Sequence, residues 1–240
     1  MTAILEIQNL SKHFGGLLAL NKLSLSIEAG ELRCIIGPNG AGKTTLFGLI
    51  SGKIKPDEGQ IVFKGQALNR LSTQQISRLG IGRKFQSPTI FGNLSVLANL
   101  QVAARGKASL SDLIFSGGQN VSAKLEEILE TIQLTEKCWQ PAQLLSHGEK
   151  QWLEIGMVLA SQPSLLLLDE PTAGMTPAET HQTAQLIRYI SGQMTTIVIE
   201  HDLKFIREIG QTVTVLQHGS LLAQGPIDVI AQDPWCARLI

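Results

Sequence analysis

Cysteine is scarce in this sequence, and the few cysteines present are not arranged for cross-linking. Cys34, Cys138 and Cys236 are odd in number, lie far apart and form no C-x-x-C pair. This spacing argues against a disulfide framework and against a zinc site, which needs clustered ligands. We therefore expect buried or incidental thiols in a protein of a reducing compartment.

An excess of either charge is also absent, because 20 Lys and Arg residues balance 20 Asp and Glu residues. A net charge of zero gives no general attraction to nucleic acid or anionic lipid, so we expect no nucleic-acid partner. No run of about 18 apolar residues occurs, which argues against a transmembrane helix. Residues 1–6 lack the charged segment and long apolar stretch of a signal peptide. We expect a cytoplasmic protein that contacts a membrane only through a partner.

The 240 residues, 43% of them hydrophobic, suffice for one large α/β domain. Residues 4–10, 19–20 and 23–27 have the pattern of antiparallel strands, with a turn over 11–16. Further strands are expected at 31–36, 60–63, 82–86, 164–170, 195–199, 212–217 and 220–223. Helices are expected at 43–51, 72–79, 95–104, 121–134, 150–159, 203–209 and 226–232, with another beginning at 176.

Between residue 87 and about residue 161 the pattern becomes helical, with apolar side chains at helix spacing in 121–134. The segment 105–120 contains Gly and Ser and is expected to be partly irregular. The region has no internal repeat and no low-complexity tract. We expect a helical insertion carried on a single domain that spans 1–240.

Residues 37–45 fit the pattern G-x-x-x-x-G-K-[ST] of a phosphate-binding loop. The loop consists of Gly37, Pro38, Asn39, Gly40, Ala41, Gly42, Lys43, Thr44 and Thr45. Glycines allow the backbone to curl around an anion, so that successive N–H groups point inward. Lys43 adds a charge for the β- and γ-phosphates, and the Thr44 hydroxyl suits Mg²⁺. A glycine-rich turn that merely caps a helix is the alternative, but a strand before and a helix after the loop favour phosphate binding.

Four leucines at 165–168 indicate a strand buried on both faces, and the strand ends in Asp169 and Glu170. Adjacent strand residues point in opposite directions, so the two carboxylates can have different roles. Asp169 can hold Mg²⁺ through its water shell, and Glu170 can polarise the water that attacks a γ-phosphate. A strand also needs polar residues where it leaves the core, and only the upstream phosphate loop favours the catalytic interpretation.

Three further side chains are candidates for the same site. His201 follows the strand at 195–199 and would emerge at the same sheet edge as Asp169 and Glu170, which favours a γ-phosphate contact over the role of an ordinary hydrogen-bonded histidine. Gln86 ends a strand, where its amide can reach Mg²⁺ or the attacking water. Phe14 either packs in the core or offers a flat face to a nucleobase, and its position leaves both open.

Ser146 and Glu149 form the pattern of a capping box before a helix. Segment 145–149, some twenty residues before the four-leucine strand, also resembles the signature of ATP-binding cassette (ABC) ATPases. The resemblance covers nearly the whole chain. Phe14 matches the family's base-stacking aromatic, 37–45 its Walker A loop, Gln86 its Q-loop, 165–170 its Walker B strand and His201 its switch histidine.

The resemblance implies a P-loop NTPase with a RecA-like mixed-sheet core, an N-terminal antiparallel β region and an inserted helical subdomain. It implies that ATP and Mg²⁺ are cofactors and that ATP hydrolysis powers transport at the cytoplasmic face of the inner membrane, where the subunit is peripheral. Two cassettes, identical or different, would pair head to tail, with Ser146 and Gly148 binding the partner's ATP. Transmembrane permease subunits would dock near the apolar segment 88–91, and a substrate-binding protein would act indirectly.

Two places depart from the family pattern. His147 replaces the second signature Gly, and Glu149 replaces a Gln. A carboxylate near a γ-phosphate repels it unless it points away or is offset by a cation, for which Lys150 is the candidate. The Asp that usually follows the Walker B segment is replaced within 173–176, so communication between the two ATP sites is in question.

Within the family, 14–20 and Gly174 resemble importers of branched-chain amino acids and related amides. Segments 82–86, 145–157 and 173–176 look closest to the ATPase subunit of urea importers. Nothing in the chain touches the cargo, so urea, amides and amino acids remain open.

A non-transport cassette would usually have a tandem cassette or a long coiled coil, and a P-loop kinase leaves the segment around Ser146 unexplained. An ATPase for export or lipid extraction would use the same motifs.

Overall fold

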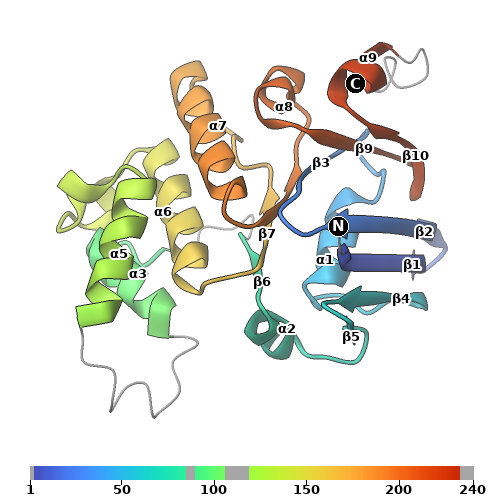
Figure 1. The fold of residues 1–240 in the computed structure, drawn as a ribbon, viewed down its shortest axis with the longest axis horizontal. Coiled ribbons are helices and arrows are strands. Elements are labelled where there is room, and N and C mark those ends of the chain that lie inside the picture. Colours follow the sequence, from blue (N-terminus) through green and yellow to red (C-terminus); the bar gives the residue numbers. More distant parts are fainter. Residues whose placement is uncertain (1–2, 85–89, 106–118, 233–240) are drawn as a thin grey trace.

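The computed structural model describes residues 3–84, 90–105 and 119–232. Within these ranges the chain forms two sheets and a group of helices (Figure 1). The N-terminal strands lie at one end of the molecule, and α3, α5 and α6 lie at the other.

The N-terminal sheet is antiparallel and has the strand order β2-β1-β4-β5. Its strands are β1 (Ala3–Phe14), β2 (Leu17–Glu28), β4 (Glu58–Phe63) and β5 (Gln66–Ala67). The predicted turn at 11–16 is wrong, because the chain stays extended through Phe14 and turns only at residues 15 and 16. The predicted break between 20 and 23 is also wrong. Asn9 and Lys22 adopt left-handed φ values of 46° beside register shifts, so bulges carry each strand through these points.

The second sheet has the strand order β10-β9-β3-β8-β7-β6. Its strands are β3 (Leu32–Ile36), β6 (Ile81–Arg83), β7 (Leu165–Asp169), β8 (Thr195–Ile199), β9 (Thr212–Gln217) and β10 (Ser220–Gly225). All neighbours are parallel except β9 and β10. The carboxyl ends of β3, β7 and β8 therefore meet at one edge of the sheet, where α/β proteins place their ligands. The predicted strand 82–86 ends early, at Arg83, and Gln86 lies outside the described residues.

Both faces of this sheet are covered, as the four-leucine run predicts. Leu166 and Leu168 of β7 belong to the core shared with the larger helices, whereas Leu165 and Leu167 belong to the core shared with α1 and the N-terminal sheet. The helices are α1 (Lys43–Ile50), α2 (Thr73–Leu79), α3 (Val96–Arg105), α5 (Gln119–Thr131), α6 (His147–Ala160), α7 (Pro177–Ser191), α8 (Leu203–Ile209) and α9 (Ile227–Gln232). Two short 3-10 turns lie at Thr135–Lys137 and Ala142–Leu144.

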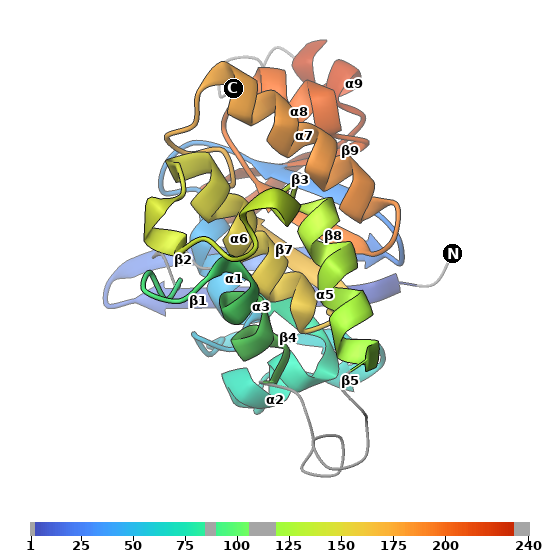
Figure 2. The same cartoon turned by 90° about the vertical axis from the view of Figure 1, so that its left-hand side faces the viewer.

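The predicted helical insertion is present. Helices α3 and α5 pack against α6 and stand in front of the sheet in the rotated view (Figure 2). Gly156 of α6 permits this close approach, because a Cβ there would lie 2.7 Å from Ile132 and 3.2 Å from Leu100. In the part of the chain that the structure describes, no helix is long and apolar enough to cross a membrane.

Candidate functional site

The loop between β3 and α1 has a backbone that only glycine can adopt at two positions. Gly37 and Gly42 have φ values of 145° and 98°. A Cβ at Gly37 would lie 2.1 Å from the Leu216 carbonyl oxygen, and one at Gly42 would lie 2.6 Å from the Ala19 carbonyl oxygen. Because Gly42 is the N-cap of α1, no capping side chain covers the first N–H groups of the helix. This helix end can therefore bind an anion through its backbone.

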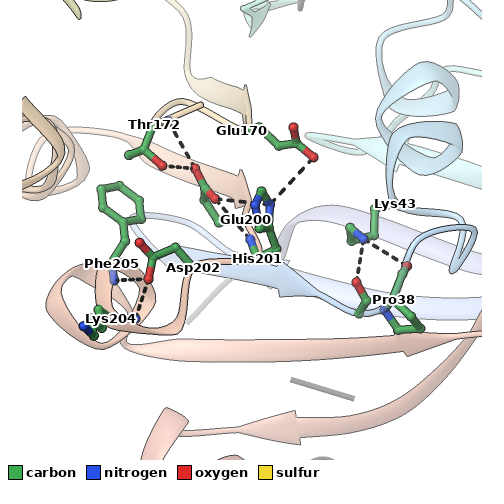
Figure 3. A network of polar contacts seen from close by, with 10 residues as sticks. Pro38, Lys43, Glu170, Thr172, Glu200, His201, Asp202, Lys204 and Phe205 are labelled. Carbon is green, nitrogen blue, oxygen red and sulfur yellow. Dashed lines mark hydrogen bonds and ion pairs between the residues drawn. The ribbon is translucent and has the colours of Figure 1, made fainter. Parts of the chain in front are cut away.

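Lys43 is held over this loop although it is nearly buried. Its ammonium donates hydrogen bonds to the carbonyl oxygens of Gly37, at 2.6 Å, and Pro38, at 3.1 Å (Figure 3). Burial lowers the pKa of Lys43, and the charges of Glu170 and Asp169 act in the opposite direction. The two carboxylates at the end of β7 and the loop lysine thus belong to one electrostatic site.

Asp169 is buried at the end of β7 and has one oxygen engaged. Its Oδ2 lies 3.2 Å from Nη2 of Arg83, while Oδ1 has no hydrogen-bond partner within the described structure. Burial raises the pKa of Asp169, and Arg83 opposes that rise. A buried carboxylate oxygen without a partner suits a hard cation. The described residues contain no cluster of three His, Cys, Asp or Glu side chains that could hold a metal. A cation here would therefore share Asp169 with Thr44, which is exposed at the start of α1, and with a bound molecule.

Glu170 follows Asp169 in a strained backbone conformation. Its φ is 47°, and its N–H donates to the Ile199 carbonyl at 3.0 Å, which fixes this conformation against β8. Its Oε1 lies 3.9 Å from Nδ1 of His201, and the two side chains face each other in Figure 3. A pocket of about 450 Å³ is lined by these two residues together with Ile36, Gly37, Pro38, Asn39 and Ile206. The sheet edge thus combines a carboxylate, an imidazole and the phosphate loop around one open space.

Glu200 belongs to the site, although the sequence analysis gave it no role. Its side chain is 1% exposed. It accepts hydrogen bonds from the Thr172 hydroxyl at 2.6 Å and from the His201 N–H at 3.1 Å (Figure 3). Glu200 thus ties the loop that follows Glu170 to the backbone of His201. The sequence could have indicated Glu200, because this residue directly follows the fully buried strand β8.

Cys34 is a free, buried cysteine, as the sequence predicts. Burial is the main cause that raises the pKa of Cys34 to about 12, and the neighbouring Glu200 adds to it. Cys138 is partly buried and also free, and Cys236 lies outside the described residues.

Phe14 ends β1 at the tip of the first hairpin, with 46% of its surface exposed. The Lys12 ammonium lies 5.6 Å from its ring centroid. This exposure counts against the core-packing alternative, and much of the ring surface is open for stacking.

Ser146 and Glu149 form the predicted capping box at the start of α6. The Ser146 hydroxyl accepts from the Glu149 N–H at 3.2 Å, and Glu149 Oε2 accepts from the Ser146 N–H at 2.9 Å. The cation that offsets Glu149 is Lys137, at 2.5 Å, which corrects the candidate Lys150. Burial alone would raise the pKa of Glu149, but the hydrogen bonds from Lys137 and Ser146 outweigh it and lower the value. The carboxylate is thus turned back toward its own cap.

Ser146 and Gly148 lie beside α7. The Ser146 hydroxyl is 3.3 Å from Glu179 Oε1, and the Gly148 N–H also donates to Glu179. Neither residue is among those that line the pocket at the phosphate loop. The structure therefore does not bring these two predicted residues to the loop of the same chain.

His147 joins α6 to the loop that follows β7. Its Nε2 lies 2.9 Å from the Ala173 carbonyl oxygen, which also accepts from the Gln151 side-chain amide at 3.0 Å. Lys84, just after β6, donates to Gln151 Oε1 at 2.7 Å. Two of the three departures from the family pattern, His147 and the segment 173–176, are thus parts of one polar network.

Comparison with known proteins identifies the family. The sequence model of the ABC transporter family matches residues 20–173. The chain is 37% identical to the high-affinity branched-chain amino acid transport ATP-binding protein LivG of Escherichia coli (strain K12), over 96% of this chain and 94% of that protein. It is 34% identical to a probable branched-chain amino acid transport ATP-binding protein LivG of Archaeoglobus fulgidus, over 96% of this chain and 92% of that protein.

Solved structures agree with the sequence comparison. The ADP conformation of MJ1267, an ATP-binding cassette of an ABC transporter, superposes with a TM-score of 0.88 at 29% identity, over 99% of this chain and 98% of that one. A nucleotide-free ATP-binding cassette from an ABC transporter superposes with a TM-score of 0.85 at 29% identity, over 98% of each chain. These likenesses confirm the predicted P-loop NTPase fold with its antiparallel β region and added helices. The chain belongs to the ABC transporter family and is one of its ATPases.

Proposed function

We propose that this chain, as a single cassette over 1–240, hydrolyses ATP to power import through partner membrane subunits. The convergence of the phosphate loop, Asp169, Glu170 and His201 on one sheet edge is the observation that carries the proposal. Loop N–H groups of 37–45 and Lys43 would bind the phosphates, and the exposed Phe14 would stack on the adenine. Lys43 would exchange its hydrogen bonds to the loop carbonyls for bonds to phosphate oxygens.

Thr44, Asp169 and Gln86 are the residues that would hold Mg²⁺ on the nucleotide. When bound, Mg²⁺ would neutralise charge on the β- and γ-phosphates. The partnerless Oδ1 of Asp169 fits that role, and Thr44 starts the helix that follows the loop. Gln86 lies outside the described residues, so its assignment rests on the sequence alone.

Glu170 would accept the proton of the attacking water, because its carboxylate borders the pocket beside the loop. His201, which faces Glu170 across the pocket, would contact the γ-phosphate, and Glu200 would hold the His201 backbone in place. Lys43 would stabilise the charge that develops on the departing phosphate oxygens.

A second cassette, identical or different, would complete each site. Ser146 and Gly148 lie beside α7 rather than in the pocket of their own chain, which supports their use on the ATP of a partner. The hydrogen bonds to Glu179 would then be exchanged for bonds to phosphate. Residues 88 and 89 of the expected docking segment 88–91 lie outside the described residues. Phe91 in this segment and the nearby Leu94 and Leu144 expose 51%, 39% and 64% of their surfaces, which supports permease docking at this place. The chain would sit peripherally at the cytoplasmic face of the inner membrane, and a substrate-binding protein would deliver the cargo.

For the cargo, we favour branched-chain amino acids over urea. The relatives cited above are named for branched-chain amino acid transport, and none of them is named for urea. Urea or a related amide is the second candidate. It rests on the resemblance of segments 82–86, 145–157 and 173–176 to the ATPase subunit of urea importers. These three segments are in contact: Gln151 is hydrogen-bonded to Lys84, to His147 and to the Ala173 carbonyl.

The proposal is tested with the chain co-purified with its membrane subunits and reconstituted in lipid. ATP hydrolysis is measured with the substrate-binding protein added empty, loaded with leucine, or offered urea. Stimulation by leucine alone supports an amino acid importer, and stimulation by urea alone selects the second candidate. An ATPase rate that responds to neither contradicts both cargo assignments while leaving the hydrolytic site to be tested by its own variants.

A further inference from the structure

Arg83 ends β6 and enters the site from the strand next to β7. It pairs with Leu167 in the sheet register, two residues before Asp169. Its side chain is 7% exposed and that of Asp169 is 0% exposed, so the contact between Nη2 and Oδ2 at 3.2 Å is a buried ion pair. We propose that Arg83 is a positioning residue that fixes the Asp169 carboxylate for the Mg²⁺ carried by the nucleotide.

The guanidinium is itself held from a second direction. Its Nη1 lies 3.1 Å from the Ser51 hydroxyl, at the C-terminal cap of α1. Its central carbon lies 5.6 Å from the ring centroid of Phe47, in the same helix. Since α1 carries Lys43 and Thr44 at its other end, Arg83 connects the helix of the phosphate loop to the carboxylate of β7.

The pairing also determines which carboxylate oxygen remains available. Arg83 engages Oδ2, and Oδ1 has no partner among the described residues. Because Arg83 holds Oδ2, the Asp169 carboxylate cannot rotate freely, and Oδ1 stays in a fixed orientation. Without Arg83, the buried Asp169 carboxylate would lack its counter-ion and would be free to turn. A carboxylate that can turn holds a cation less well, so the effect of Arg83 is expected in the Mg²⁺ requirement as well as in stability.

This inference rests on the proposed role of Asp169 and is tested by nucleotide binding rather than turnover. A fluorescent ATP analogue is titrated into the full-length chain at a series of free Mg²⁺ concentrations and, separately, in EDTA. For Arg83→Gln, half-maximal binding should need about tenfold to a hundredfold more Mg²⁺, as for other residues that support a metal ligand. Affinity in EDTA should match the parent chain, because the phosphate loop and Phe14 are intact.

Three variants make the result decisive. Asp169→Asn should raise the Mg²⁺ requirement at least as much as Arg83→Gln; an unchanged requirement would refute the proposed role of Asp169 itself. Ser51→Ala removes a contact of Arg83 that does not involve Asp169, and should leave the requirement close to that of the parent.

Arg83→Lys keeps the charge without the forked geometry and should give an intermediate requirement. This variant replaces Arg83→Gln in the test if Arg83→Gln does not fold. If Asp169→Asn raises the requirement and both Arg83 variants do not, or if they weaken binding equally with Mg²⁺ and in EDTA, Arg83 has no positioning role.

Discussion

Nε2 of His147 lies 2.9 Å from the carbonyl oxygen of Ala173, so the first turn of α6 is bound to the loop that follows β7. A glycine occupies the next loop position, Gly174, with a φ of 74°. The ring of His147 fills the space beside it, at 3.1 Å from where a Cβ would lie. His147 departs from the family's signature pattern, and the loop 173–176 lacks the family's usual aspartate. These two departures therefore contact each other.

Replacing His147 by glycine, the residue usual in the family, should destabilise this chain. The variant loses a hydrogen bond to Ala173, worth about 1 kcal/mol of unfolding free energy, and adds backbone freedom to the first turn of α6. Guanidinium denaturation of His147→Gly measures the change. Glu130→Ala, an exposed substitution on α5, is the control and should be close to neutral. A His147→Gly variant as stable as this control would contradict the contact.

Gly174→Ala should also lower the unfolding free energy, by about 1–2 kcal/mol for the left-handed backbone alone. The new methyl group would in addition press on the His147 ring. The double variant with His147→Gly separates the two causes, because it relieves the ring contact and keeps the backbone cost. The prediction is a double variant less destabilised than the sum of the single ones, and strict additivity would rule out the contact.

Glu149→Gln restores the family's residue and should leave ATP-dependent pairing of cassettes within about twofold of the parent, since no ion pair with phosphate is gained or lost. The carboxylate of Glu149 faces Lys137 and its own cap instead. Much tighter pairing, seen by sedimentation with ATP, would mean that Glu149 faces the phosphates after all.

The same variant has a predicted pH dependence. The folded pKa of Glu149 lies below its unfolded value of about 4.5, so its charge stabilises the fold above that pH. This contribution is lost as the pH falls through the folded pKa. The difference in melting temperature between parent and Glu149→Gln should therefore be present at pH 7 and shrink below pH of about 4.5. A difference that grows on acidification would contradict the lowered pKa.

Lys43→Ala should weaken ATP binding itself. Loss of a charged hydrogen-bond donor to phosphate is expected to cost about 2 kcal/mol, or roughly thirtyfold in Kd. Calorimetric titration with ATP measures the change. Lys204→Ala removes the same charge from an exposed position on α8 and is the matched control. Equal affinities of the two variants would refute the assignment of the phosphate loop.

The parts of this site that could be predicted from sequence are those whose signal is local. The glycine-rich loop between a strand and a helix, the four-leucine strand and the capping boxes at Ser146 and Thr176 each extend over a few residues, and each is found as predicted. Local spacing is sufficient there because the hydrogen bonds involved join near neighbours in the chain.

Contacts between distant segments could not be predicted in this way. Glu149 pairs with Lys137, which lies in a 3-10 turn twelve positions earlier, whereas proximity in sequence favours the adjacent Lys150. Bulges at Asn9 and Lys22 depend on strand pairing, so the first hairpin is longer than its sequence pattern indicates. Glu200 directly follows a buried strand, but its hydrogen bonds to Thr172 join residues 28 positions apart, and local spacing does not encode such contacts.

The central claim is that Glu170 accepts a proton in an ATPase site completed by a second cassette, and Glu170→Gln tests it most directly. An amide at this position cannot take the proton, and it removes a negative charge beside the γ-phosphate. Hydrolysis should fall by roughly a hundredfold to ten-thousandfold, with ATP binding retained. Glu127→Gln on α5 is the control for the charge change. With ATP and Mg²⁺, light scattering after gel filtration should show Glu170→Gln as a dimer and the control as a monomer. A Glu170→Gln chain that hydrolyses ATP at close to the parent rate, and stays monomeric with ATP, would contradict the account.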